Sequence, residues 1–372
     1  MNDRIRFAVI GTGKRSDTVY APLLKTLKEH VELVGVWDRS EDKARAFGEK
    51  HRIPWFTDLD HLRNDLELDA VIVSVARPAN GEIGRRVIEL GLHALLETPI
   101  ANSLEDADAI IKGGEANNLK VEVAEQYYRR PIERLKRKLI DADVLGRILV
   151  AYNDFMGHGY HGVSLIRSYI GFDIPVVSVN GLVAKLSVAP HYSWISQSYA
   201  ARDEEWEHAS LRFASGALAF YNWSSISYDS ALRWQRSTRF FAERGMAQDD
   251  RLTTLSPDGK DPKRIEIKRF FHNVGGMETL RELVAQSSPE IVWRNPFQSY
   301  YMDDEMIAVA DCLMSLVDAI REDKLPEYGP LQARLDQQVM LAIYESAKNL
   351  GANVRLRIKR ELSKEHSGET ER

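Results

Sequence analysis

A short glycine-rich segment near the middle of the chain combines residue types that move protons. Gly157-His158-Gly159-Tyr160-His161 carries two imidazoles, and an imidazole, with a pKa of about 6.5, accepts a hydroxyl proton near neutral pH. We interpret His161 as a candidate general base and His158 as a second candidate. A buried histidine bonded to a backbone carbonyl is the alternative for His161, and a solvated side chain is the alternative for His158.

A glycine turn near the N-terminus has the spacing of a dinucleotide-binding site. The segment from Val9 to Ser16 reads VIGTGKRS and lies between an apolar run and a helical pattern. Glycines there allow backbone N–H groups to approach a pyrophosphate at a helix N-terminus. Serine replaces the third glycine of the G-x-G-x-x-G pattern and is small enough for close packing, although an ordinary strand-to-helix loop is the alternative. The predicted cofactor contacts are Gly11, Thr12, Gly13, Lys14, Arg15 and Ser16.

Asp38 ends the next apolar run, 27 residues after Gly11. A carboxylate at the end of the second strand of such a fold binds the ribose 2′-hydroxyl and repels a 2′-phosphate. NAD is therefore the predicted cofactor. Arg39 and Ser40 follow directly and are able to accommodate a 2′-phosphate, so NADP stays an alternative.

Apolar runs and helical patterns alternate over residues 1–125, which predicts a doubly wound parallel sheet. The expected strands are 5–10, 31–37, 70–75, 93–96 and 120–124, and the expected helices 21–29, 41–51, 82–90 and 104–117. From about residue 147, strand-like runs follow one another without intervening helices, which predicts a largely antiparallel sheet. Two helical patterns, 302–321 and 331–350, precede a polar tail at 359–372. We expect a Rossmann domain at 1–125 and a second α/β domain at 126–358.

Composition excludes several classes of partner. The net charge of -5 supplies no general attraction to nucleic acid or anionic lipid. A single cysteine, Cys312, cannot form an internal disulfide, and no Cys/His cluster has metal-ligand spacing. The N-terminus lacks the apolar core of a signal peptide, and no run of 18 apolar residues occurs. We expect a cytoplasmic protein without a metal site.

Beyond the glycine turn, several segments resemble the Gfo/Idh/MocA family of sugar and cyclitol oxidoreductases. They are Val73-Ser74-Val75-Ala76-Arg77-Pro78, Gly91-Leu92-His93-Ala94-Leu95-Leu96-Glu97-Thr98-Pro99, Glu125-Gln126-Tyr127-Tyr128-Arg129-Arg130-Pro131, Gly159-Tyr160-His161 and Ala342-Ile343-Tyr344-Glu345-Ser346-Ala347. The resemblance implies an open-faced mixed sheet in the second domain, a carbohydrate substrate and a homodimer or homotetramer built through that sheet. It also implies further cofactor contacts at Ser74, Ala76, Glu97 and Gln126.

Several positions depart from the family pattern, among them Glu82, which stands where a histidine is often found, and Ser164, which stands where an Asp follows the histidine. Thr98 stands where the family has the lysine of Glu-Lys-Pro, and Gly157 stands where it has an Asp four residues before the histidine. Of the family's Lys, Asp and His, His161 alone remains. We expect Thr98 with bound water, or Tyr128, to replace the lysine in part. The candidate substrate contacts are Tyr20, Arg130, Arg167 and Lys185, for which helix packing, ion pairs and solvent exposure are the alternatives.

Aromatic side chains gather at His191, Tyr192, Trp194, Tyr199 and Trp206. Such rings pack on sugars or form oligomer interfaces, and we favour the interface. Three functions remain open. The first is an NAD-dependent oxidoreductase acting on a sugar, cyclitol or polyol. The second is a redox-neutral NAD-dependent glycosidase that oxidises its sugar transiently, and the third is a non-catalytic sensor or scaffold that binds nucleotide or sugar.

Overall fold

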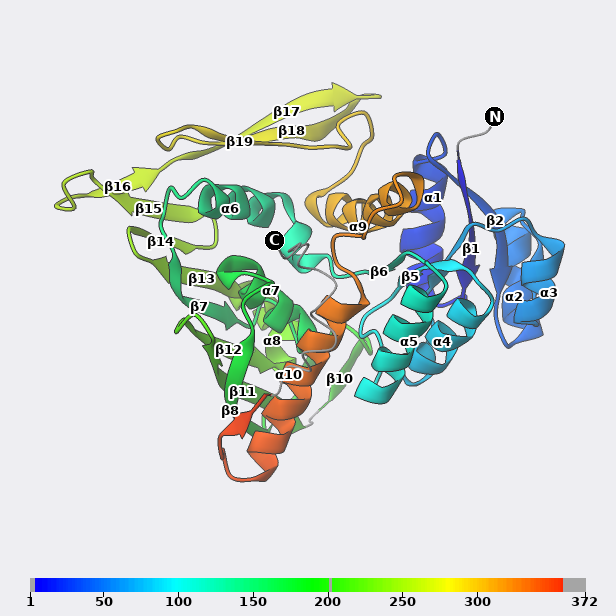
Figure 1. Cartoon of the computed structure of the whole chain (residues 1–372), viewed down its shortest axis with the longest axis horizontal. Helices are drawn as coiled ribbons and strands as arrows, with labels where there is room; N and C mark the ends of the chain where they lie inside the picture. The colour runs from blue at the N-terminus through cyan, green and yellow to red at the C-terminus, as the bar shows by residue number, and fades with distance from the viewer. Residues whose placement is uncertain (1–3, 201–202, 357–372) are drawn as a thin grey trace, which may run out of the picture. The chain divides into compact units, whose positions relative to one another are not determined.

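The computed structural model describes residues 4–200 and 203–356. They form two compact units (Figure 1). The first comprises 4–131, 270–282 and 294–337, and the second comprises 132–200, 203–269, 283–293 and 338–356. Neither unit is one continuous stretch of chain. The expected polar tail at 359–372 lies outside the described residues.

The first unit is built on a parallel sheet of order β3-β2-β1-β4-β5-β6, counted over the described residues. The central strands are buried, as their unbroken aliphatic sequences require when helices cover both faces. This arrangement confirms the predicted doubly wound sheet. The strands are β1 (Ile5–Ile10), β2 (Val31–Trp37), β3 (Trp55–Phe56), β4 (Ala70–Val73), β5 (His93–Leu96) and β6 (Val121–Val123).

Helices follow each strand of this sheet. In Figure 1, α4 and α5 lie side by side, and α4 packs on β4 and β5. The long helix α9 packs on β5 and β6, although it comes from the C-terminal third of the chain. The helices of this unit are η1 (Ser16–Tyr20), α1 (Ala21–Thr26), α2 (Glu41–His51), α3 (Leu59–Asp65), η2 (Arg77–Ala79), α4 (Asn80–Glu89), α5 (Leu104–Ala116), η3 (Tyr127–Arg129) and α9 (Asp304–Arg321).

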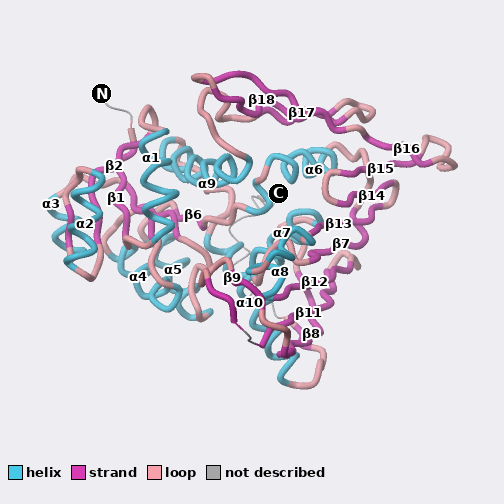
Figure 2. Tube along the Cα trace, turned by 180° about the vertical axis from the view of Figure 1, so that it is seen from behind, coloured by secondary structure: helices cyan, strands magenta, loops and turns pink. Residues whose placement is uncertain are grey.

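The second unit is built on a mixed sheet whose described strands follow the order β16-β15-β14-β13-β7-β12-β11-β8-β20. Figure 2 shows most of them as a ladder from β16 to β8. The β7–β12 pair is parallel and the others are antiparallel. This confirms a largely antiparallel second sheet. The bounds are β7 (Ile148–Asp154), β8 (Val176–Ser187), β11 (Asp203–Phe213), β12 (Leu218–Ser224), β13 (Ser237–Ala242), β14 (Gly245–Gln248), β15 (Arg251–Leu255), β16 (Pro262–Ile265) and β20 (Val354–Arg355).

One prediction about this region was wrong, because a helix interrupts the strands. Helix α7 (Tyr160–Ile170) packs on β7 and β12, and each of its residues is buried. A helix that is buried on every side is harder to distinguish from a buried strand by its sequence than a helix with one exposed face. The remaining elements are α6 (Pro131–Asp141), α8 (Ser225–Asp229), η4 (Ala231–Gln235), α10 (Pro330–Lys348), β9 (His191–Ser193), β10 (Ser198–Ala200), β17 (Ile267–Val274), β18 (Met277–Ala285) and β19 (Ile291–Arg294).

Among the described helices, none combines the length and the apolar character that crossing a membrane requires.

Candidate active site

The predicted cofactor residues of the first unit follow the carboxyl ends of its parallel strands. The glycine turn follows β1, Asp38 follows β2, Ser74 and Ala76 follow β4, and Glu97 follows β5. Gln126 comes after β6. The carboxyl edge of a doubly wound sheet is where such folds bind ligands.

Gly11 allows the chain to turn tightly against the neighbouring strand end. Its φ of +98° lies in the left-handed region, and a Cβ there would stand 2.4 Å from the carbonyl oxygen of Ser74. Two backbone bonds fix the turn: the Gly11 N–H donates to the Trp37 carbonyl at 2.7 Å, and the Ser74 N–H to the Ile10 carbonyl at 2.8 Å. Only glycine fits this position, as a cradle for a pyrophosphate requires.

Asp38 points its carboxylate at the glycine turn. Its Oδ2 accepts from the Thr12 hydroxyl at 2.7 Å and from the Thr12 N–H at 3.0 Å, and its Oδ1 accepts from the Ser40 N–H at 3.0 Å. Burial would raise the pKa of Asp38, but these hydrogen bonds outweigh burial and hold that pKa below its usual value. Asp38 is therefore an ionised acceptor beside the turn.

The sequence after β5 is fixed by contacts from three other segments. Glu97 accepts hydrogen bonds from the Arg15 guanidinium, which also forms an ion pair with it, and from the Tyr20 hydroxyl. The Asn80 side-chain amide donates to the carbonyls of Glu97 at 3.3 Å and Pro99 at 3.0 Å. Tyr20 is fully buried, so it contacts Glu97 from inside the unit. Sequence analysis did not single out Asn80, because nothing local marks a contact to residues after the next strand.

The polar side chains of the glycine turn fit the binding of a dinucleotide. The buried hydroxyl of Ser16 has no hydrogen-bond partner within the described residues, and neither does the buried Nη2 of Arg15. Ligand oxygens would satisfy both donors. The Ser16 hydroxyl, the Gly11 cradle and the Asp38 carboxylate together fit the expected cofactor.

The residues after β6 contact other segments of the first unit through an ion pair, hydrogen bonds and ring contacts. Arg129 is fully buried, and its Nη2 donates to Glu122 Oε1 at 2.6 Å, so the two side chains form a structural ion pair. Arg130 Nε donates to Glu305 Oε2 at 2.9 Å, and its guanidinium lies 4.3 Å from the Tyr127 ring centroid. Gln126 reaches the same carboxylate, at 3.5 Å. Tyr128 is buried, with its ring 5.8 Å from that of Tyr328.

In the second unit, the predicted proton-transfer residues form one aromatic cluster at the start of α7. The ring centroids of His158 and His161 are 4.8 Å apart, and the Tyr160 ring is 4.6 Å from that of His161. His161 is 5% exposed. The Trp223 ring lies 6.3 Å from that of His158. The structure therefore brings the two predicted histidines together.

The backbone that carries this cluster is anchored at two glycines. The Asn153 amide exchanges two hydrogen bonds of 2.9 Å with the backbone of Gly157, and the Gly159 N–H donates to the Tyr221 hydroxyl at 2.6 Å. Tyr221 in turn donates to the buried Glu207 at 2.6 Å. Burial raises the pKa of Glu207 and, more strongly, that of Tyr221. Tyr221 and Glu207 were missed because they lie on strands far from the motif in sequence.

Gly157 leaves no room for the acidic side chain that the resemblance would place at this position. A Cβ at this position would stand 2.7 Å from the Gly162 nitrogen and 2.9 Å from the His161 carbonyl carbon. Those distances are too short for any side chain unless the start of α7 moves. The exchange of Asp for Gly therefore accompanies a close approach between the loop and the helix.

The other two predicted substrate contacts of this unit differ in exposure. Arg167 is buried in α7, and its Nη2 donates to the Phe172 carbonyl at 2.9 Å, which is an anchoring role. Lys185 is exposed on β8, opposite Glu205 in the strand register. A substrate contact remains a prediction for both residues.

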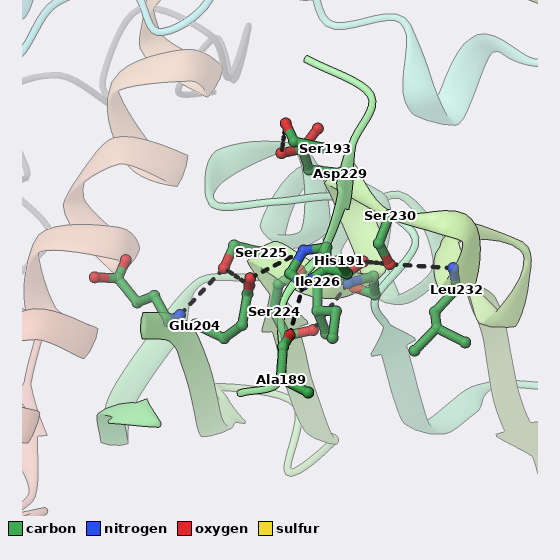
Figure 3. A network of polar contacts seen from close by, with 12 residues as sticks. Ala189, His191, Ser193, Glu204, Ser224, Ser225, Ile226, Asp229, Ser230 and Leu232 are labelled. Carbon is green, nitrogen blue, oxygen red and sulfur yellow. Dashed lines mark hydrogen bonds and ion pairs between the residues drawn. The ribbon is translucent and has the colours of Figure 1, made fainter. Parts of the chain in front are cut away.

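Three residues of the aromatic stretch, His191, Tyr192 and Trp194, line a cavity of about 540 Å³ in the second unit. Figure 3 shows the polar contacts around it, among them Ser193 donating to Asp229 at 2.6 Å and His191 at 3.4 Å from Glu204. Both carboxylates are buried. The lining is completed by Gln197, Ile226, Ser230, Ala231 and Leu232.

A comparison with protein families identifies the first unit. Residues 5–125 match the model described as "Oxidoreductase family, NAD-binding Rossmann fold" (GFO_IDH_MocA). This segment is similar to the Rossmann domain of that oxidoreductase family. The glycine turn and Asp38 are thus part of an NAD-binding Rossmann domain.

Several curated proteins are similar to this chain. Oxidoreductase P35 of Formosa agariphila is 31% identical over 156 residues, which cover 41% of this chain and 47% of that protein. The matched segment thus spans less than half of that relative's own length. The putative oxidoreductase YceM of Salmonella typhimurium is 23% identical but covers 92% of this chain and 98% of its own.

Solved structures share the whole fold. The WlbA dehydrogenase of Bordetella pertussis, in complex with NADH and UDP-GlcNAcA, has a TM-score of 0.67 at 18% identity and covers 96% of this chain and 100% of its own. Levoglucosan dehydrogenase, in complex with NADH and levoglucosan, has a TM-score of 0.69 at 15% identity and covers 95% and 99%. Identities this low show a common architecture.

Proposed function

We propose that this chain is an NAD-dependent oxidoreductase that acts on a sugar, cyclitol or related polyol. The observation that carries the proposal is the ionised Asp38 carboxylate, held against the Gly11 turn by Thr12. A carboxylate there accepts hydrogen bonds from the ribose hydroxyls and repels a 2′-phosphate, which favours NAD over NADP. The carbohydrate class is supported by the names of similar proteins, including the D-xylose dehydrogenase of Paenarthrobacter nicotinovorans.

The chain's own residues would divide the work as follows. Gly11 would allow the pyrophosphate to approach the backbone N–H groups of the turn, and Asp38 would bind the adenosine ribose. The bound dinucleotide supplies the hydride acceptor. His161, held by the anchored α7 start, would accept the hydroxyl proton of the substrate. Thr98 has no charge to contribute.

We further propose a homodimer or homotetramer built through the open face of the second sheet. On that face the strand register places Leu182 and Leu186 beside Trp206, while Phe241 lies opposite Val150. Leu182 is 60% exposed and Leu186 49%. A partner copy that covered these side chains would remove apolar surface from water.

The decisive experiment uses cofactor-stripped protein. NAD should raise its thermal midpoint more than NADP does, and a panel of sugars, cyclitols and polyols should then produce NADH, followed by absorbance. A larger shift with NADP would contradict the assignment of Asp38. Solvent deuterium entering a glycoside's sugar carbon without net NADH would replace net oxidation with the redox-neutral reaction. No shift with either dinucleotide would favour the non-catalytic alternative.

A further inference from the structure

The structure offers a cation beside the position where the family's lysine is missing. Thr98 follows Glu97 directly, and its backbone N–H donates to Glu97 Oε2 at 3.1 Å. The other oxygen of the same carboxylate binds Arg15. One carboxylate therefore links the neutral residue at the lysine position to a guanidinium from the glycine turn.

Two residues, Glu97 and Tyr20, hold this guanidinium in place. Glu97 binds its Nε, while the Tyr20 ring centroid lies 5.5 Å from its central carbon. Tyr20 is itself fixed, because it is fully buried and its hydroxyl donates to Glu97 at 2.5 Å. Because Glu97 binds one edge of the guanidinium and the Tyr20 ring lies against its face, the group keeps a defined orientation. A preorganised hydrogen-bond donor requires such an orientation.

The free edge of the guanidinium points to a ligand. Arg15 Nη2 is buried and has no hydrogen-bond partner among the described residues. A buried charged donor without an acceptor is costly, so such a group normally binds an oxygen. The Arg15 side chain as a whole is 35% exposed, so it lies near the surface of the unit although its Nη2 is covered.

We propose that Arg15 is a catalytic residue that supplies the positive charge missing at Thr98. Its Nη2 would donate a hydrogen bond to the oxygen of the substrate carbon that is oxidised, where negative charge grows as the hydroxyl proton leaves. Arginine keeps its proton throughout, so it stabilises this charge but cannot act as the base. This role rests on the proposed function.

Its test combines a loss with a rescue. Arg15→Met should lower kcat/KM for the polyol about 10² to 10³-fold, the usual effect of removing one donor to a developing oxyanion. Arg15→Lys should lose less. Thr98→Lys, added to Arg15→Met, should restore at least tenfold, because it returns an ammonium at the family position. Arg45→Met, which removes an exposed arginine of α2, is the matched control and should leave kcat/KM unchanged.

A binding readout separates this role from cofactor binding. The dissociation constant of NADH, measured by its fluorescence, should stay within about threefold in Arg15→Met, and the thermal midpoint confirms folding. Two results would overturn the proposal: kcat/KM within threefold of wild type, or NADH affinity reduced as much as kcat/KM. Failure of Thr98→Lys to rescue would also overturn it. A wild-type protein that binds no dinucleotide would instead contradict the proposed function itself.

Discussion

The Tyr221 hydroxyl lies 2.6 Å from the Gly159 nitrogen and accepts its N–H, which ties the start of α7 to strand β12. The same hydroxyl donates to Glu207 at 2.6 Å, and Tyr344 donates to the other oxygen of that carboxylate at 2.6 Å. Two tyrosines thus share one buried acid, but only Tyr221 also reaches the backbone beside His158 and His161.

Tyr221→Phe should reduce both stability and turnover. It leaves the Gly159 N–H and one Glu207 oxygen without this partner, which costs about 1 to 3 kcal/mol of unfolding free energy. It also loosens the backbone that carries His161, so kcat should fall about tenfold or more while NADH affinity is unchanged. Tyr344→Phe is the matched control: it should lower the thermal midpoint but not kcat. Equal effects of both substitutions on kcat would refute a positioning role for Tyr221.

Gly157→Asp should not restore the family's catalytic acid. The new Cβ would lie within 3 Å of the α7 backbone, and such overpacking costs about 1 to 3 kcal/mol. The thermal midpoint should therefore fall, and kcat should decrease because His161 is displaced. Gly114→Ala in α5, where a Cβ meets its nearest atom at 3.5 Å, should be tolerated. A gain in kcat for Gly157→Asp would contradict the crowding argument.

Asp38→Ser should shift cofactor preference toward NADP. The substitution removes an ionised acceptor for the ribose hydroxyls, and hydrogen bonds to charged groups contribute about 1.5 to 3 kcal/mol. The dissociation constant of NAD should rise about 10 to 100-fold, whereas that of NADP should fall because the repulsion is gone. Titration of both dinucleotides against wild type and variant checks this. Unchanged selectivity would mean that Asp38 does not contact the ribose.

Glu122 should make stability depend on pH. It is fully buried beside Arg129, Ser315 and the Tyr328 N–H, and burial raises its pKa from 4.5 to about 7. Arg129, Ser315 and the Tyr328 N–H stabilise the charged carboxylate, but burial outweighs them, so the folded state binds the Glu122 proton more tightly than the unfolded chain does. This stabilisation is complete below pH 4.5 and is lost as the pH rises through about 7. The unfolding free energy of wild type minus that of Glu122→Gln should fall by on the order of 1 to 3 kcal/mol over this range. A difference that stays constant with pH would contradict the shift.

Leu182→Lys combined with Phe241→Lys should break the proposed oligomer. Both side chains are exposed on the second sheet, and lysines there would place charge in a covered apolar interface. Light scattering should then report a monomer where wild type is a dimer or tetramer. Leu325→Lys, which changes a 64% exposed leucine outside the sheet, is the control. A wild-type monomer would exclude the proposed assembly.

The sequence by itself determined the Rossmann architecture and the direction of its ligand edge. Strands such as 31–37 and helices such as 41–51 have the bounds expected from local periodicity, because burial on a sheet imposes a pattern on consecutive residues. The Gly11 turn and Asp38 were also visible, since their chemistry depends on short spacing and on the ends of adjacent strands.

Only the tertiary structure decided how the departures from the family pattern are accommodated. Arg15 reaches Glu97 across 82 residues, and Gly159 reaches Tyr221 across 62. No local period records contacts between such distant segments, because their geometry depends on how whole strands and helices pack. For the same reason, the crowding at Gly157 became apparent only once α7 was placed against its own preceding loop.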